Sequence, residues 1–551
     1  MTGITNNRDL AATATAVDMD ALMEQVDAVV AGWMAENRAP ALQLAITDRD
    51  GLLATRAYGY ADFAAQRPLT DAELFEFGSI GKSFTAIICL QLAEEGVLDL
   101  HAPVTQYLPW FEIPSRFAPI TLHHLLTHTA GLINGSDFSP DPRYEVWALR
   151  ESEASELGVK ARYSNAGYKL VGLLLEQVTG QPYAQLVQER IFAPLGMDTA
   201  EGAVTNAARA HMAVGYTAPF RDRPWRPEHG WAPATWFETN TADGCLIANA
   251  SELATYLRML LNRGDSPGGR ILSEASFAQL TTPHTHFDAD EPYGYGLGLH
   301  EKDGRPRVAH SGGMVGYISQ MIGDPEAGVG VVALTNAMLD TEPIAEFALQ
   351  SVVNARRGDA PPAPPAPPAT EYASYAGVFT GPHGAVTIEA GPTGLTLLRG
   401  EERISLHPSE RSWRKDAFLA NHPDFALAVI QFRRNDDDAV TEFTHGADWY
   451  RGERYDGPTE FETPPEWLAY VGHYTSHNPW FSDLRIGVCK GELCVMHGGG
   501  APQSLVQDGD RFRPADDAEG PEWFEFDTIV NGEALRVREA GGNALYRFFT
   551  P

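Results

Sequence analysis

The spacing of apolar side chains predicts that the first two thirds of this 551-residue chain mix helices and strands, whereas the rest is all β. From about residue 19 to 33, apolar residues recur every three or four positions, which is typical of one face of a helix. Residues 41–47 and 52–60 form two strand-like stretches on either side of a short polar turn. This pattern predicts a β-hairpin directly after the helix.

Strand-like patterns return near the end of this first part. Residues 99–205 are mostly helical in spacing, whereas 315–322 and 329–335 are predicted strands and about 343–354 is a closing helix. Strands at both ends with helices between them indicate an α+β domain. We expect one antiparallel sheet assembled from both ends, flanking helices, and a helical insertion that leaves a cleft against the sheet.

A run of prolines and alanines follows this domain, and an internal repeat comes after it. Proline-rich stretches favour extended, stiff linkers. Both copies of the repeat carry short alternating strands and glycine-rich turns, which predict small antiparallel barrels. The expected order is a tail at 1–17, the main domain at 18–357, a linker at 358–370, and barrels at 371–456 and 464–551.

The composition is typical of a globular protein, with 44% apolar residues. Its 73 acidic and 41 basic residues give a net charge of −32, which argues against nucleic acid and anionic membranes as partners. No apolar run is long enough to predict a membrane helix. The four cysteines form no disulfide or metal-ligand pattern, so we expect no metal and no cofactor; a homodimer stays open.

The beginning of the chain lacks the basic and apolar stretches of a signal peptide. We therefore expect a cytoplasmic protein, or a periplasmic one if a leader was removed. Few disulfide-forming cysteines also suit a reducing compartment.

The strongest candidate chemistry lies at Ser79-Ile80-Gly81-Lys82, a Ser-x-x-Lys tetrad before an apolar helical stretch that ends at Gly96. A serine in the first helical turn lies near unpaired backbone N–H groups and the positive end of the helix dipole. Lys82, three residues on, shares its helix face. A serine hydroxyl becomes a strong nucleophile when an adjacent amine takes its proton. Because such a tetrad also arises by chance, other motifs must decide.

A second motif, Tyr163-Ser164-Asn165, lies in a turn before another apolar helix. A tyrosine beside a lysine can pass on the serine proton, and an asparagine can hold a substrate amide. The same residues are also common as loop caps, so the motif gains weight only beside the tetrad.

A third motif, His310-Ser311-Gly312-Gly313, precedes the predicted strand at 315–322. Glycines there would let the backbone of a substrate lie along a strand edge. The amides of Ser79 and Gly313 would then form an oxyanion hole. The plain alternative is a turn that leads into the strand.

In this order, the three motifs resemble those of the serine penicillin-recognising enzymes, specifically the class C β-lactamase-related serine hydrolases. Residues 120–132 and 293–298 resemble the same family, so the resemblance covers about residues 20–355. It implies a β-lactamase-like fold and a serine hydrolase that works through an acyl-enzyme.

The resemblance also implies a role for each motif residue. The catalytic residues would be Ser79, Lys82 and Tyr163, and the substrate-binding residues Asn165, His310, Ser311, Gly312 and Gly313. In related motifs a serine stands in place of Tyr163 and a lysine in place of His310. The first change fits class C. The second removes a fixed cation that would bind a substrate carboxylate, which argues against efficient β-lactam hydrolysis.

The layout with two further barrels resembles that of D-aminopeptidases, whose barrels are lipocalin-like, and is similar to that of the serine peptidase that cleaves linearised microcystin. This resemblance implies small peptides with D-residues such as D-Ala as substrates. Two alternatives stay open: a carboxylesterase of the same family, and a non-catalytic ligand sensor that uses the barrels as binding modules.

We also expect a barrel loop to reach the mouth of the cleft and restrict the substrate. The charged, turn-rich stretch 409–424 is the candidate in the first barrel, and the three glycines at 498–500 are the candidate in the second. The alternative is that the linker tethers both barrels as passive modules.

Overall fold

The computed structural model describes residues 17–135, 141–365, 372–409 and 416–549. Nearly all of the predicted tail and the last five residues of the predicted linker, 366–370, lie outside these residues. Within the described part, no helix is both long and apolar enough to cross a membrane.

One antiparallel sheet forms the centre of the main domain. Its strands, in spatial order, are β14 (Val308–Met314), β15 (Tyr317–Asp324), β16 (Val329–Thr335), β1 (Ala41–Asp48), β2 (Leu52–Asp62) and β3 (Arg67–Pro68). β1 pairs with β16 on one side and β2 on the other, so strands from the two ends of the domain meet in the middle of the sheet. The sheet predicted from both ends is confirmed.

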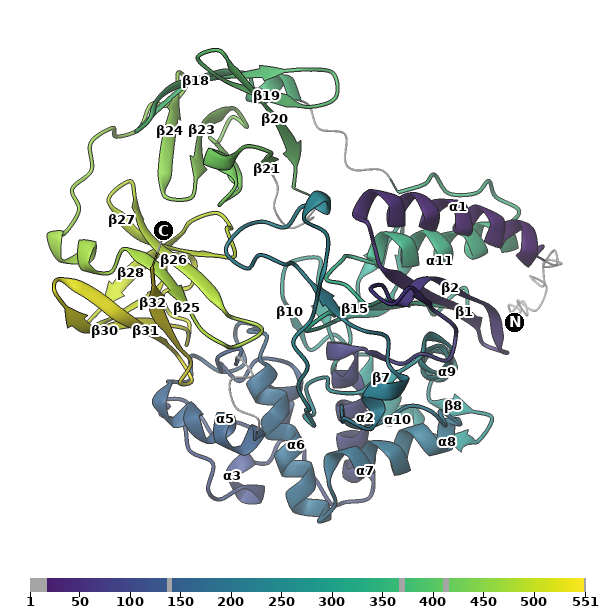
Figure 1. Cartoon of the computed structure of the whole chain (residues 1–551). Helices are drawn as coiled ribbons and strands as arrows, with labels where there is room; N and C mark the ends of the chain where they lie inside the picture. Colours follow the sequence, from purple (N-terminus) through teal and green to yellow (C-terminus); the bar gives the residue numbers. More distant parts are fainter. Residues whose placement is uncertain (1–16, 136–140, 366–371, 410–415, 550–551) are drawn as a thin grey trace, which may run out of the picture.

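Helices cover both faces of this sheet (Figure 1). α1 (Met19–Asn37) and α11 (Glu342–Arg357) lie together on one face and share a core with β1 and β16. α9 (Ala250–Leu261) packs on the opposite face. Because both faces are covered, all eight residues of β1 are buried, and the strand shows no alternation of polar and apolar positions.

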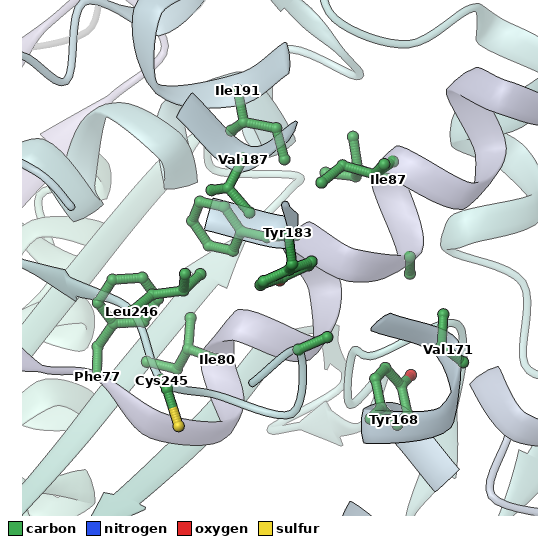
Figure 2. Packing of buried hydrophobic residues seen from close by; sticks show 14 of the residues in the cluster. Phe77, Ile80, Ile87, Tyr168, Val171, Tyr183, Val187, Ile191, Cys245 and Leu246 are labelled. Carbon is green, nitrogen blue, oxygen red and sulfur yellow. The ribbon is translucent and has the colours of Figure 1, made fainter. Parts of the chain in front are cut away.

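The helical insertion packs below α9 around the apolar helix α2. Its helices are α2 (Gly81–Glu94), α3 (Val104–Tyr107), α4 (Leu122–Leu126), α5 (Pro142–Ala148), α6 (Asn165–Thr179), α7 (Tyr183–Val187), α8 (Ala193–Leu195) and α10 (Glu274–Leu280). Two short strands, β4 (Phe75–Glu76) and β7 (Ile247–Ala248), pair just before α2. Figure 2 shows apolar side chains of α2, α6 and α7 in one contiguous core, which fixes the start of α2.

Two closed, eight-stranded antiparallel barrels follow, in green and yellow in Figure 1. The first consists of β17 (Gly377–Gly381), β18 (Gly384–Ala390), β19 (Leu395–Arg399), β20 (Glu402–Pro408), β21 (Ala417–Ala420), β22 (Ile430–Arg434), β23 (Val440–His445) and β24 (Asp448–Gly452). The second consists of β25 (Gly472–Thr475), β26 (Asp483–Cys489), β27 (Glu492–His497), β28 (Gln503–Asp508), β29 (Arg511–Pro514), β30 (Phe524–Val530), β31 (Glu533–Glu539) and β32 (Ala544–Phe548). The predicted fold class is confirmed.

The third motif lies in a different element from the one predicted. The sequence placed it at the start of a strand predicted at 315–322, but His310–Gly313 lie within a separate strand, β14, and a turn after Met314 leads to β15. Gly312 stands opposite Ser319 in the ladder with β15. The motif residues have little β-propensity, because they are a histidine, a serine and two glycines. The strand is therefore evident only from its hydrogen-bonded pairing with β15.

Candidate active site

Ser79 lies in a short 3₁₀ turn, Gly78–Ile80, that leads directly into α2. Three glycines bring backbone close to it. Gly78 has a φ of +52°, and a Cβ there would lie 2.7 Å from the Gly313 nitrogen. A Cβ on Gly244 would lie 2.5 Å from the Gly78 carbonyl carbon. Ser79 therefore sits between β14 and the Gly244 segment, where only glycine leaves enough space.

Lys82 is fully buried beneath Ser79, and its ammonium is surrounded by neutral oxygens. Nζ donates to Ser79 Oγ at 2.9 Å, to Asn165 Oδ1 at 2.7 Å and to the Asp243 carbonyl at 2.7 Å. These three bonds match the three donors of a lysine. In the described part of the chain, no carboxylate oxygen lies within 4.0 Å of Nζ. Three hydrogen bonds to neutral oxygens therefore orient the amine.

Tyr163 covers this amine, and a buried histidine supports the tyrosine. The Tyr163 ring centroid lies 4.7 Å from Lys82 Nζ. The His128 ring stacks on Tyr163 at 4.3 Å, and its Nδ1 accepts a hydrogen bond from the Ser164 amide at 3.0 Å. Burial and the positive charge of Lys82 hold the pKa of His128 well below its ordinary value. His128 is thus a neutral imidazole that carries its proton on Nε2.

His310 lies on β14, near enough to Lys82 for the lysine charge to affect its pKa. Its Nδ1 lies 2.5 Å from the Ser311 carbonyl, and its Nε2 lies 3.0 Å from the Tyr293 hydroxyl. Burial lowers the pKa of His310 to about 4, helped by the charge of Lys82 and opposed by the Ser311 bond. At neutral pH, Nδ1–H therefore donates to Ser311, and the tyrosine hydroxyl donates to Nε2. The residue that replaces a lysine in the third motif carries no charge.

The structure brings the three sequence motifs together. Ser79, Lys82 and Asn165 are joined by hydrogen bonds, Tyr163 lies over the amine, and Gly313 lies against the turn of the serine. Sequence reasoning missed further contacts: the Asp243 carbonyl on Lys82, the His128 ring under Tyr163, and the Tyr293 hydroxyl on His310. The first is a backbone atom and has no residue signature. The other two lie in the stretches that carried the family resemblance, but spacing gave them no role.

Comparisons with known proteins agree with this geometry. The family model described as Beta-lactamase matches residues 26–354, which is more than half of the chain. Penicillin-binding protein 4* of Bacillus subtilis (strain 168) is 27% identical over 327 residues, which cover 53% of this chain and 67% of that protein. Penicillin-binding protein 4 of Amycolatopsis lactamdurans is 28% identical over 322 residues, covering 56% and 83%. The chain belongs to the β-lactamase family.

A solved structure, the octameric penicillin-binding protein homologue from Pyrococcus abyssi, superposes with a TM-score of 0.57 at 23% identity. The superposition covers 79% of this chain and 99% of that one. This share is larger than the family-matched region, so the likeness in fold extends beyond the main domain. The family membership confirms the predicted resemblance.

Proposed function

We propose that this β-lactamase-family serine hydrolase is a peptidase that cleaves amide bonds next to D-residues such as D-Ala through an acyl-enzyme. A linearised cyclic peptide, such as linear microcystin, is the candidate substrate. The observation that carries the proposal is the bonded set of Ser79, Lys82 and Asn165 under the Tyr163 ring.

The geometry supports the following reaction. Once the Lys82 and Tyr163 pair has released one proton to solvent, Ser79 Oγ attacks the amide carbonyl and passes its own proton to the pair, and the amides of Ser79 and Gly313 bind the oxyanion. The tetrahedral intermediate expels the amine, which takes that proton. Water then attacks the ester on Ser79 and loses a proton to the same pair. The bond to Ser79 Oγ breaks, Oγ takes that proton from the pair, and the acid leaves the free serine.

The edge of the sheet supports a peptide as the substrate. The outer side of β14 bonds to Gly298 at Ala309. Among the described residues, no further strand pairs with this edge from Ser311 to Met314. Gly312 packs against Phe77 and Ser319, whereas a Cβ on Gly313 would meet only Ile318 Cδ1, at 3.5 Å. An extended peptide can therefore add to the edge and bring a carbonyl to Ser79, as strand addition does in other peptide-binding proteins.

The neutral His310 supports substrates without a carboxylate next to the scissile bond. A penicillin or a terminal D-Ala presents such a carboxylate, and an uncharged imidazole provides no fixed charge to bind it. An internal peptide bond, an amide or an ester has no carboxylate next to the scissile bond, so its binding does not require a fixed positive charge. The same observation favours the second candidate, a carboxylesterase.

The barrels give little support to a ligand sensor. Phe379, Phe418, Phe432 and Phe443 meet inside the first barrel with ring centroids 5.2–5.9 Å apart. Aromatic rings at these distances form a packed core. The interior of this barrel therefore does not resemble a ligand-carrying cavity. The preference for D-residues rests on the resemblance in domain layout alone.

Paired substrates test the proposal. Purified protein is incubated with a linear peptide amide that contains D-Ala, its L-Ala diastereomer, and the matching esters, with Ser79→Ala as the blank. We expect the D-peptide to have the highest kcat/KM. Its amine product should appear in an initial burst as the acyl-enzyme accumulates.

Two outcomes would replace this proposal. Fast turnover of both esters without amide cleavage would favour the carboxylesterase. No turnover of any ester or amide, together with no covalent labelling by a fluorophosphonate, would favour the sensor.

A further inference from the structure

The second barrel contacts the main domain beside the Tyr163–Asn165 turn, which we call the catalytic turn. Trp523 and Ala540 of this barrel are buried in the same core as the helices of the main domain. Gly541 approaches Ile133 so closely that a Cβ would lie 2.3 Å from the isoleucine Cδ1. Figure 1 shows the barrel against the helical insertion, near α5 and α6.

Asp517 of this barrel holds one side of the catalytic turn. Its carboxylate pairs with Lys160 at 2.9 Å and bonds to the guanidinium of Arg162. Arg162 directly precedes Tyr163, and its amide donates to the His128 carbonyl at 2.7 Å. Burial raises the pKa of Asp517, but the bonds from Lys160 and Arg162 lower it by more. The resulting pKa is below the ordinary value of an aspartate. The carboxylate stays ionised at neutral pH.

Glu522 holds the other side of the turn through Asn134. Glu522 Oε1 accepts from the Asn134 amide at 2.7 Å. Asn134 Oδ1 accepts from the Asn165 amide at 3.4 Å, and the Asn134 carbonyl accepts from the Ala166 amide at 2.9 Å. The start of α6, and with it the ligand Asn165 of Lys82, is thus connected to the barrel by consecutive hydrogen bonds.

We propose that the second barrel positions the Tyr163–Asn165 turn for catalysis, with Asp517 and Glu522 as its positioning residues. The turn carries both the side chain over Lys82 and the side chain bonded to it. Loss of either contact lets the turn shift, and a small misplacement of a catalytic group reduces turnover strongly. The barrel then sets kcat for every substrate, including ones too small to reach it. This inference rests on the proposed function only in that Ser79 must form an acyl-enzyme.

The test compares Asp517→Ala and Glu522→Ala with two controls. Asp527→Ala is the matched control, because Asp527 also bridges two cations, Arg536 and Arg538, but lies within the barrel. Glu522→Gln is the conservative control, because its amide oxygen can still accept from Asn134. The readouts are the rate of Ser79 labelling by a fluorophosphonate and the kcat and KM on a small ester.

We expect both test variants to lower the labelling rate and kcat roughly tenfold with KM nearly unchanged. Both controls should stay within about twofold of the wild type. Wild-type labelling rates in Asp517→Ala and Glu522→Ala would overturn the proposal, and so would an equal loss in Asp527→Ala. If Asp517→Ala does not fold, Glu522→Ala and Glu522→Gln decide, because equal rates in these two overturn it.

The labelling rate needs no peptide substrate, so it is independent of the preference for D-residues. A wild type that labels but cleaves no D-peptide refutes the proposed substrate and leaves this inference testable. A wild type that does not label at all refutes the acyl-enzyme itself.

Discussion

Two of the buried cations of the main domain, Lys82 and Arg307, have opposite kinds of partner. Both are fully inaccessible to solvent. Arg307 bonds to Asp324 Oδ2 at 3.0 Å and to Glu346 Oε1 at 3.2 Å, and Arg305 bonds to the same aspartate. This cluster lies between β14, β15 and α11. Its charges are compensated, and Asp324 has a pKa below its ordinary value: burial raises it, but the Arg305 bond and neighbouring amides outweigh this effect.

Lys82 has only neutral oxygens around it, and this difference is informative. A buried charge costs several kcal/mol unless a partner or hydrogen bonds compensate it. Compensation by carboxylates fixes a proton and a geometry, which suits a structural role. Three neutral acceptors orient the amine without forming an ion pair. The proposed function assigns Lys82, which is bonded only to neutral oxygens beside Ser79, the role of a base, whereas the arginine cluster has ion-paired partners and a structural role.

The largest expected effect comes from exchanging each cation for methionine. Lys82→Met should lower the fluorophosphonate labelling rate by about a thousandfold and leave the unfolding free energy unchanged or about 1 kcal/mol higher. Arg307→Met should lose about 3–5 kcal/mol of unfolding free energy, because it leaves buried carboxylates without their partner. The folded fraction of this variant should be labelled at the wild-type rate. Urea denaturation and labelling kinetics measure both. Similar losses of stability in the two variants would erase the distinction.

Tyr163 sharpens the comparison, because the proposed reaction has it share the serine proton with Lys82. Tyr163→Phe alone should lower the acylation rate about a hundredfold. The double variant with Lys82→Met should lose far less than the product of the single losses, since groups that act as one unit are non-additive. Single-turnover kinetics on an ester, for the wild type, both single variants and the double variant, measure this double-mutant cycle. Independent, multiplying losses would refute the shared proton.

Glu76 shows a third way to bury an ionisable group, in which the group is neutral. Burial raises its pKa to about 8, and its Oε2 has no hydrogen-bond partner. The folded protein thus prefers the neutral acid, and this contribution to stability is lost as pH rises from the unfolded-state value through 8. A glutamine at position 76 cannot ionise. Between pH 6 and 8, the unfolding free energy of Glu76→Gln should therefore rise by about 2 kcal/mol relative to that of the wild type. Urea denaturation at both pH values checks this; a constant difference would contradict the burial argument.

The smallest expected effect is at His128, a neutral support under Tyr163. The residue has a φ of +57°, which asparagine tolerates, and an asparagine oxygen can replace Nδ1 as acceptor for Ser164. His128→Asn keeps these features and removes only the stacked ring. We expect kcat to fall roughly fivefold with KM unchanged. A change confined to KM would place His128 against the substrate instead.

The sequence was sufficient for the fold class and for bringing Ser79, Lys82, Tyr163 and Asn165 into one site. Helical and alternating periodicity are local signals, and the motif order matched one cleft. The strand β14 was not found, because its motif residues lack β-propensity. The Asp243 carbonyl and the contacts of Asp517 could not be predicted, since they depend on how distant segments pack.

The expected barrel loops show the same limit. Part of the stretch 409–424 lies outside the described residues. Gly499 approaches Pro224 of the main domain, where a Cβ would lie 2.5 Å from the proline Cδ, and it accepts from the Val429 amide of the first barrel. Glycine flexibility thus indicated a close approach between domains. The segment that contacts the neighbourhood of the catalytic turn is a different one, with Asp517 and Glu522, and no composition signal distinguished it.

The central claim is that Ser79, activated by an uncompensated buried lysine, forms the acyl-enzyme. The most direct measurement is the intact mass of the full chain after incubation with a fluorophosphonate, followed by peptide mapping, for the wild type and Ser79→Ala. The account predicts one adduct per wild-type chain, on the peptide that contains Ser79, and none on the variant. An adduct on another residue, or equal labelling of Ser79→Ala, would contradict it.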